Sequence, residues 1–245
     1  MKVKLLLIFL VLILPHTAWS ADIPTLSIHL GDGNNPDDWF TGLKILALLT
    51  ILTLAPSALV MMTSFTRIVI VFAFLRQALG TQQSPPTQVL IGLALFMSVF
   101  IMMPVWDKID AEAITPYLAE NISQAEAFEK AKAPIQAFML RQTRNDDLLL
   151  FLDAAHMEKP ATASATPMHV LIPSFIISEL RTAFEIGFLI YIPFVVLDLV
   201  VASVLMSMGM MMLPPVMISL PLKIILFVLV DGWHLLTASL LQSFK

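Results

Sequence analysis

Long apolar stretches separated by short polar breaks dominate the chain, and they predict helices rather than strands. Three such stretches cover residues 43–63, 68–75 and 89–105. Two more apolar stretches flank a methionine-rich break at 206–215, and the stretch before the break covers residues 186–205. Stretches of this length and spacing are typical of helices in an apolar surrounding, so the pattern predicts an all-α protein built from helical hairpins.

Prolines interrupt the first three stretches. Pro56, Pro85, Pro86 and Pro104 each remove a backbone donor and disfavour helical geometry in the residue before them. The pieces between them fall near the lower limit for crossing the hydrocarbon core of a membrane. We therefore expect broken helices rather than standard membrane spans.

The segment 107–160 is polar and carries half of the chain's charged side chains. Ser123 followed by Glu126 is a capping-box signal, Pro134 predicts a kink, and Asn145 offers a second helix N-cap. We expect two or three short amphipathic helices in a small water-exposed domain, followed by a linker at 159–167 that is rich in Ala, Thr, Ser and Pro.

Two phenylalanines in this polar segment, Phe138 and Phe151, are candidate oligomer contacts. About fifty residues build only a marginal core, so both rings could pack against another copy of the protein. The alternative, in which both fill the local core, is equally compatible with the sequence. If they are contacts, truncating either ring to alanine weakens the oligomer.

The N-terminal residues 1–20 have the pattern of a secretory signal peptide. Lys2 and Lys4 precede the apolar run 5–14, and small residues precede a cleavage point after Ser20 or Ala21. A retained anchor is the alternative, but the apolar run is short for a span. Cleavage places the mature N-terminus outside the cytoplasm, and by the positive-inside rule the segment with Arg67 and Arg76 is then cytoplasmic.

These features divide the chain into five parts. They are the signal peptide (1–20), an extracytoplasmic lead-in (21–42), a first apolar hairpin region (43–106), a polar extracytoplasmic helical domain with its linker (107–167), and a second apolar hairpin region (168–245).

Isolated charges in the second apolar region need partners. Arg181 and Glu185 are four residues apart and can pair on one helix face. Asp198 and Lys223 stand alone in apolar runs, where an unpaired charge is expensive. We expect Lys223 to pair with Glu179 or Asp198, between helices or between subunits. A structural salt bridge is favoured over a proton relay, which needs a chain of ionisable groups.

The break at 206–215 combines helix breakers with methionines. Gly209, Pro214 and Pro215 predict a loop, and irregular backbone at membrane depth must be buried in protein or line a water-filled passage. The methionines within this break are Met206, Met208, Met210, Met211 and Met212.

Composition excludes several classes of protein. With 58% hydrophobic residues, 13% charged residues and a mean hydropathy of +0.86, a soluble monomer is excluded. The formal charge of −4 and the lack of a basic cluster argue against nucleic-acid binding. The chain has no cysteine and no HExxH, GxSxG, P-loop or GxGxxG motif, so neither an enzyme nor a cofactor is predicted.

Four motifs together resemble the FliP family of flagellar biosynthesis proteins and, beyond it, the SctR-type proteins of virulence secretion systems. They are FTRIVIV at 65–71, LRQALGTQQ at 75–83, SELRTAF at 178–184 and MGMMMLPP at 208–215. The resemblance extends from about residue 43 to the C-terminus. It is weakest over 107–160.

The resemblance implies a subunit of a type III protein export gate in the bacterial inner membrane, at the flagellar basal body. The expected partners are other copies in a pentamer-like ring, FliQ-like and FliR-like proteins, and unfolded export substrates. Helical hairpins are then expected to stack into a helical assembly. The main alternatives are a conventional polytopic transporter, which should carry an internal repeat, and a structural assembly scaffold.

In such a ring, the methionine-rich loops of several copies would meet around one axis. Unbranched, polarizable side chains from Met208, Met210, Met211 and Met212 could then close on one another as a gasket and swing aside for a passing chain. The simpler alternative is that these methionines fill gaps at the tip of a hairpin.

Overall fold

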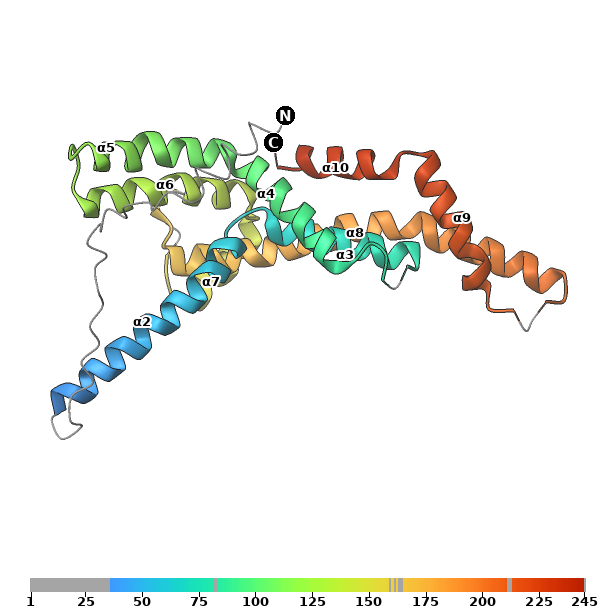
Figure 1. Cartoon of the computed structure of the whole chain (residues 1–245), viewed down its shortest axis with the longest axis horizontal. Helices are drawn as coiled ribbons and strands as arrows, with labels where there is room; N and C mark the ends of the chain where they lie inside the picture. Colours follow the sequence, from blue (N-terminus) through green and yellow to red (C-terminus); the bar gives the residue numbers. More distant parts are fainter. Residues whose placement is uncertain are drawn as a thin grey trace, which may run out of the picture. The chain divides into compact units, whose positions relative to one another are not determined.

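The computed structural model describes residues 36–81, 83–158, 160, 162, 165–210 and 213–244 (Figure 1). The predicted signal peptide and most of the lead-in lie outside these residues. Contacts divide the chain into two units, 1–52 and 53–245. In the first unit, the described residues form the apolar beginning of helix α2 (Pro36–Met61).

The second unit is helical throughout its described elements. Its elements in chain order are α3 (Phe65–Leu79), α4 (Thr87–Ile109), the π-helical turn η1 (Asp110–Ile114), α5 (Thr115–Leu118), α6 (Gln124–Gln142), α7 (Asn145–Ala154), α8 (Met168–Ser207), α9 (Pro215–Leu229) and α10 (Gly232–Gln242). No strand occurs in the part of the chain that the structure describes. The predicted all-α class is confirmed.

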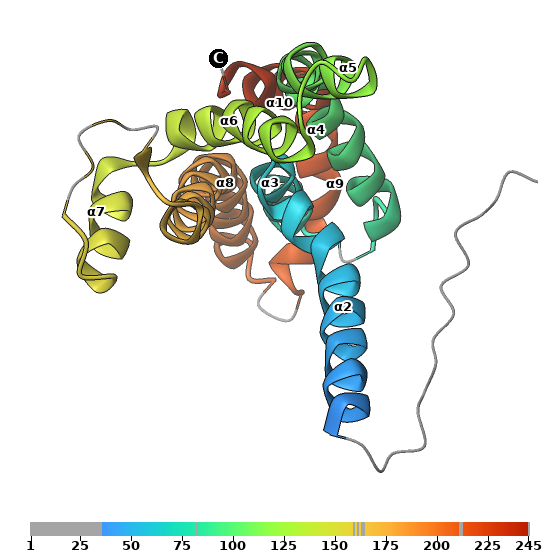
Figure 2. The same cartoon turned by 90° about the vertical axis from the view of Figure 1, so that its left-hand side faces the viewer.

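Helix α3 lies at the centre of the unit and packs against its neighbours through one apolar face. Its buried side chains recur at positions 68, 71, 72, 75, 78 and 79, which is the spacing of a single helical stripe. This stripe packs against α8 and α4. In Figure 2, α3 lies on one side of α8 and α7 on the other.

Two clusters of buried side chains make up the core. The first joins α3, the first half of α4 and α8 with Phe227 from α9 and with Leu236 and Leu240 from α10, and Phe72 is its largest fully buried member. The second joins the end of α4 to α6 and to the start of α8 around Phe138 and Phe175. Helix α4 contributes to both clusters and therefore connects them.

The prediction that prolines break the apolar helices is wrong at two positions. Helix α2 continues through Pro56, and α4 continues through Pro104. Helix α8, for which no break was predicted, also contains two prolines, Pro173 and Pro193. A proline inside a helix removes one hydrogen bond, but the surrounding turns keep theirs, and an apolar surrounding gives the backbone no better alternative. Pro85 and Pro86 do separate α3 from α4, as expected.

Consequently two helical stretches are long and apolar enough to cross a membrane. They cover 87–118 (32 residues) and 168–207 (40 residues). Helices α9 and α10 qualify as a third only if taken as one span, since a bend of 63° separates them. The first stretch runs without interruption from the apolar region into the polar one.

Helix starts in the polar region follow the sequence signals only in part. Ser123 caps α6, and its hydroxyl accepts a hydrogen bond from the backbone N–H of Glu126 at 3.3 Å. Pro134 lies inside α6 without ending it. Helix α7 begins at Asn145, but Arg144 occupies the N-cap position and no side chain caps the helix. The expected second cap is therefore absent at this helix start.

Close packing of α8 on α3 depends on Gly187. A Cβ atom at this position would lie 2.5 Å from the ring of Phe74, which also packs edge-to-face on Phe184. Gly187→Ala should therefore lower the free energy of unfolding by about 1–3 kcal/mol. Gly92 in α4 has open space around it, so Gly92→Ala should stabilise the helix by about 0.5–1 kcal/mol.

Equilibrium unfolding of the two variants in detergent measures this difference. A gain in stability for Gly187→Ala equal to that for Gly92→Ala would show that the contact between α3 and α8 is not tight.

Candidate functional site

The loop between α8 and α9 begins with a Schellman motif. The N–H of Met210 donates to the carbonyl of Leu205 at 3.0 Å, and the N–H of Gly209 donates to that of Met206 at 3.1 Å. Gly209 has a φ of +75°, the left-handed conformation that this motif requires and that glycine adopts without steric cost. Gly209 therefore ends α8 and turns the chain back.

Two prolines then start α9. Pro215 occupies the first turn of the helix, where its missing N–H leaves no helical bond unmade. Its ring also explains why Pro214 before it is extended. The methionines Met206, Met208 and Met210 and the neighbouring Leu213 are exposed. Met211 and Met212 lie outside the described residues.

A charge pair with a buried lysine joins α8 to α9. The Nζ atom of Lys223 lies 2.6 Å from Oδ2 of Asp198 and 3.2 Å from the carbonyl oxygen of Ala78 at the end of α3. Ser219 donates to Oδ1 of Asp198 at 2.6 Å. The lysine side chain is 6% exposed and the aspartate side chain 32%. The structure thus brings Lys223 to Asp198 and not to Glu179.

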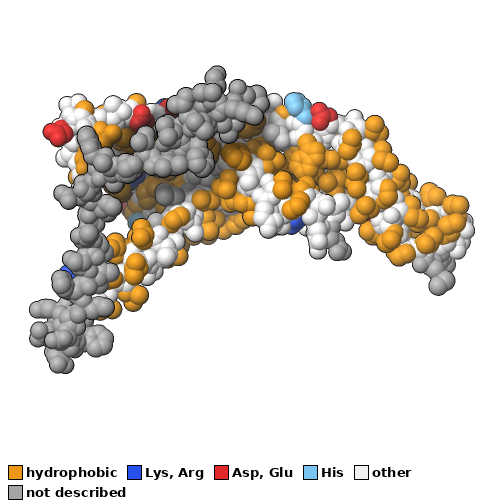
Figure 3. All heavy atoms as spheres, in the orientation of Figure 1, with side chains coloured by type: hydrophobic (Ala, Val, Ile, Leu, Met, Phe, Trp, Pro, Cys, Tyr) orange, Lys and Arg blue, Asp and Glu red, His pale blue; other side chains and the backbone are white. Residues whose placement is uncertain are grey.

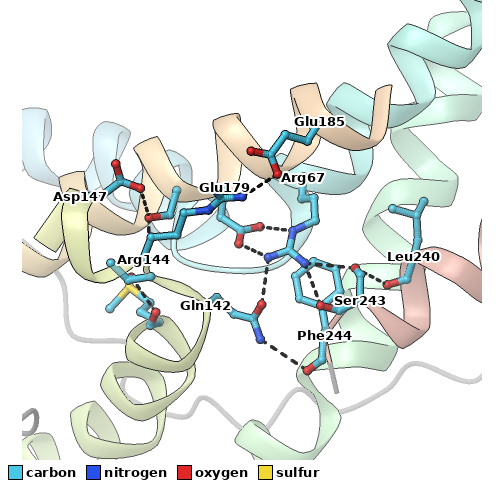
Figure 4. A network of polar contacts seen from close by, with 12 residues as sticks. Arg67, Gln142, Arg144, Asp147, Glu179, Glu185, Leu240, Ser243 and Phe244 are labelled. Carbon is cyan, nitrogen blue, oxygen red and sulfur yellow. Dashed lines mark hydrogen bonds and ion pairs between the residues drawn. The ribbon is translucent and has the colours of Figure 1, made fainter. Parts of the chain in front are cut away.

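Glu179 has a different partner, Arg67 of α3. The guanidinium donates from Nε to Oε2 at 2.9 Å and from Nη2 to Oε1, which makes the pair bidentate (Figure 4). The same Nη2 also donates to the side-chain oxygen of Gln142 at the end of α6. Arg67 is 2% exposed and Glu179 is fully buried. Three helices therefore meet at one ion pair.

Arg67 lies in a helix and not in a connecting segment. The sequence predicts it in a cytoplasmic segment between two spans, whereas the structure places it inside α3 with its side chain buried. The signal that could have suggested this is its position at the start of an uninterrupted apolar run, where a solvated loop residue is out of place.

A more exposed charge cluster lies further along α8. Arg144 donates to Glu185 at 2.6 Å, and Arg181 pairs with the same carboxylate at 3.4 Å, four residues away on one helix face. The hydrogen bond to Glu185 raises the pKa of Arg144 above its ordinary value. Desolvation by burial lowers this pKa, but by less. Nearby, Ser178 donates to Asp147 and accepts from the backbone N–H of Arg144. These contacts hold the start of α7 against α8.

The two candidate oligomer contacts lie differently. Phe138 is buried in the second core cluster, edge-to-face with Phe175 and stacked on Phe244. Its side chain fills the local core, the alternative that the sequence left open, and is not available to another copy. Phe151 is only partly buried in α7.

Among the described residues, no group of three or more His, Asp or Glu side chains could hold a metal ion.

Comparison with known proteins decides the family. Residues 48–240 match the FliP family. The flagellar biosynthetic protein FliP of Bacillus subtilis is 56% identical over 89% of this chain and 98% of that protein. The protein of the same name from Aquifex aeolicus is 49% identical over 92% of this chain and 93% of that protein. The chain belongs to the FliP family.

FliP family membership makes this chain a flagellar biosynthesis protein. Together with the two long apolar helices, it indicates a membrane-associated flagellar component. The buried pairs Arg67–Glu179 and Lys223–Asp198 then lie in the apolar part of a FliP chain, where each charge depends on its partner.

The pair Lys223–Asp198 should couple strongly in a double-mutant cycle. Asp198→Asn leaves Lys223 buried without an anion, which costs about 3–5 kcal/mol of unfolding free energy. Lys223→Met should cost less, because Asp198 is partly exposed and keeps Ser219 as a donor. The double variant should cost less than the sum of the single variants.

Unfolding free energies of the four proteins in detergent measure this coupling. Lys223→Met combined with Glu179→Gln is the matched control, and it should be additive because Glu179 binds Arg67. If the effects of Lys223→Met and Asp198→Asn on the unfolding free energy simply add, the two side chains do not stabilise each other.

Proposed function

We propose that this protein is a channel-forming subunit of the type III protein export gate, which passes unfolded flagellar proteins across the inner membrane. The observation that carries the proposal is the α8–α9 hairpin. It projects an apolar surface and ends in a loop whose described methionines, Met208 and Met210, are exposed. Figure 3 shows hydrophobic side chains gathered over this hairpin, at the right of the view.

The exposed apolar surface supports assembly with other chains. Large hydrophobic side chains are exposed along α4, α8 and α9, among them Phe96, Phe100, Phe188, Leu189, Leu199, Met217 and Leu229. Soluble monomers rarely expose apolar patches of this extent, and such patches mark protein or membrane contacts. We infer that other copies in a pentamer-like ring, FliQ-like and FliR-like subunits, and lipid cover this surface.

The loop chemistry supports a seal at the channel axis. Methionine side chains are flexible and present no fixed hydrogen-bond pattern, so they can close on one another and also yield to many different substrate chains. An apolar constriction blocks ions because water leaves it. In a ring of copies, Met208, Met210, Met211 and Met212 would form a gasket with these two properties.

The Lys223–Asp198 pair supports the proposal because it holds the hairpin that carries the gasket residues in place. Lys223 and Asp198 tie α9 to α8, and the contact of Lys223 with Ala78 ties both to α3. A hairpin anchored in this way keeps its position while the methionine side chains of the gasket rearrange. We place the protein at the flagellar basal body with its mature N-terminus in the periplasm.

A scaffold that only organises other subunits is the alternative function. It would use the same apolar surface, but it would not require flexible side chains at the hairpin tip. A conventional transporter is less well supported, because the buried charges of Arg67, Glu179 and Lys223 are each paired within the described part of the chain.

Replacing the loop methionines tests the gasket role. Changing Met210, Met211 and Met212 together to Ala removes the long side chains but leaves Gly209 and the prolines in place. Assembly should persist, and the complete gate should conduct ions under conditions in which the parent gate is closed. Conductance of planar bilayers that contain the purified gate measures this.

Met217→Ala is the matched control, since Met217 is an exposed methionine on α9 outside the loop. It should leave conductance unchanged. A triple-alanine gate as tight as the parent would remove the gasket role and leave the scaffold function.

A further inference from the structure

The two residues that follow α10 complete the contacts of the buried Arg67. Its Nη1 atom donates to the carbonyl oxygen of Ser243 at 3.0 Å and to the Ser243 hydroxyl at 3.1 Å. Glu179 and Gln142 take the remaining guanidinium donors. All five N–H donors of Arg67 are thereby used, and residue 243 supplies two of the acceptors.

The ring of Phe244 covers the same guanidinium. The ring centroid of Phe244 lies 3.8 Å from Cζ of Arg67 (Figure 4). The ring also stacks on Phe138, with 6.4 Å between the two ring centroids. A cation held over an aromatic face and shielded from water is a favourable contact. Gln142 approaches the carbonyl oxygen of Phe244 at 3.5 Å. The segment 243–244 is thus held by contacts from α3 and α6.

Helix α10 depends on this attachment because it is short. An isolated helix of its 11 residues is marginal in water, so α10 needs tertiary contacts to persist. Its inner face contributes Leu236 and Leu240 to the first core cluster. At its start, Asp231 has a φ of +50°, and the 63° bend there separates α10 from α9. The helix is therefore an arm that is attached at both ends and also packs on the core along its inner face, where Trp233 contacts Phe72 edge-to-face.

Release of the arm leaves the rest of the network intact. When Ser243 and Phe244 move away, Arg67 keeps Glu179 and Gln142, and only Nη1 needs water as a new acceptor. A cavity of about 370 Å³ lies beside Phe244, lined also by Phe100, Phe138 and Leu241. The phenylalanine ring can therefore leave without displacing α4 or α6.

We propose that Ser243 and Phe244 form a latch that docks α10 onto the Arg67–Glu179 pair, and that α10 opens about Asp231 as a separate unit when the latch is released. Opening uncovers the part of the core that α10 closes, while α3, α4, α6 and α8 stay packed. This device uses contacts of a single chain and does not depend on the gate function.

Hydrogen exchange of the full chain in detergent tests the latch. In the unmodified protein, the amides of α10 should exchange at least tenfold faster than the buried amides of α3, because they open separately. Phe244→Ala should speed exchange in α10 by roughly a further tenfold and leave α3 unchanged, since it removes the stacking contacts with Arg67 and Phe138.

Two further variants sharpen the test. Arg67→Lys keeps a positive charge for Glu179 but lacks the fork that reaches Ser243, so it should also speed exchange in α10. Leu235→Ala changes an exposed side chain of the same helix and should have no effect. A single exchange rate for α10 and α3 in the unmodified protein, or equal acceleration of both by Phe244→Ala, would overturn the latch.

Discussion

The buried ion pair between Arg67 and Glu179 is the contact on which the rest of the structure depends. Removing two charges from water is costly, and the cost is recovered only when the geometry is good and every donor is used. Here the guanidinium finds all its acceptors only when α3, α6, α8 and the segment after α10 are in place together. The pair therefore specifies how α3, α6 and α8 pack on one another.

Two charge pairs lie between the helices, while many apolar side chains face outward. Both Arg67–Glu179 and Lys223–Asp198 lie between helices, whereas long rows of Leu, Val, Phe and Met face outward from α4, α8 and α9. This arrangement suits a helix bundle in contact with lipid or with other subunits, because polar groups then find partners within the chain. It also leaves the α8–α9 hairpin, with its methionine loop, accessible for assembly.

The sequence predicted local features well and long-range ones poorly. The loop at 206–215, the cap at Ser123 and the break at Pro85 and Pro86 follow from local backbone chemistry. The continuity of the helices through Pro56 and Pro104 does not follow from local backbone chemistry. It depends on whether the surroundings offer other hydrogen-bond partners to the backbone groups that each proline leaves unpaired. The partner of Glu179, Arg67, lies 112 residues away in the sequence, so no spacing rule could identify it. Whether Lys223 pairs with Asp198 or with Glu179 depends on how α8 packs on α9.

The central claim is that this apolar chain exists as one of several copies in an export gate. Native mass spectrometry of the detergent-extracted protein, co-expressed with its FliQ-like and FliR-like neighbours, tests this most directly. If the chain is a gate subunit, the spectrum shows a complex that contains several copies of the chain together with the FliQ-like and FliR-like proteins. A protein that remains a monomer under these conditions would contradict this claim.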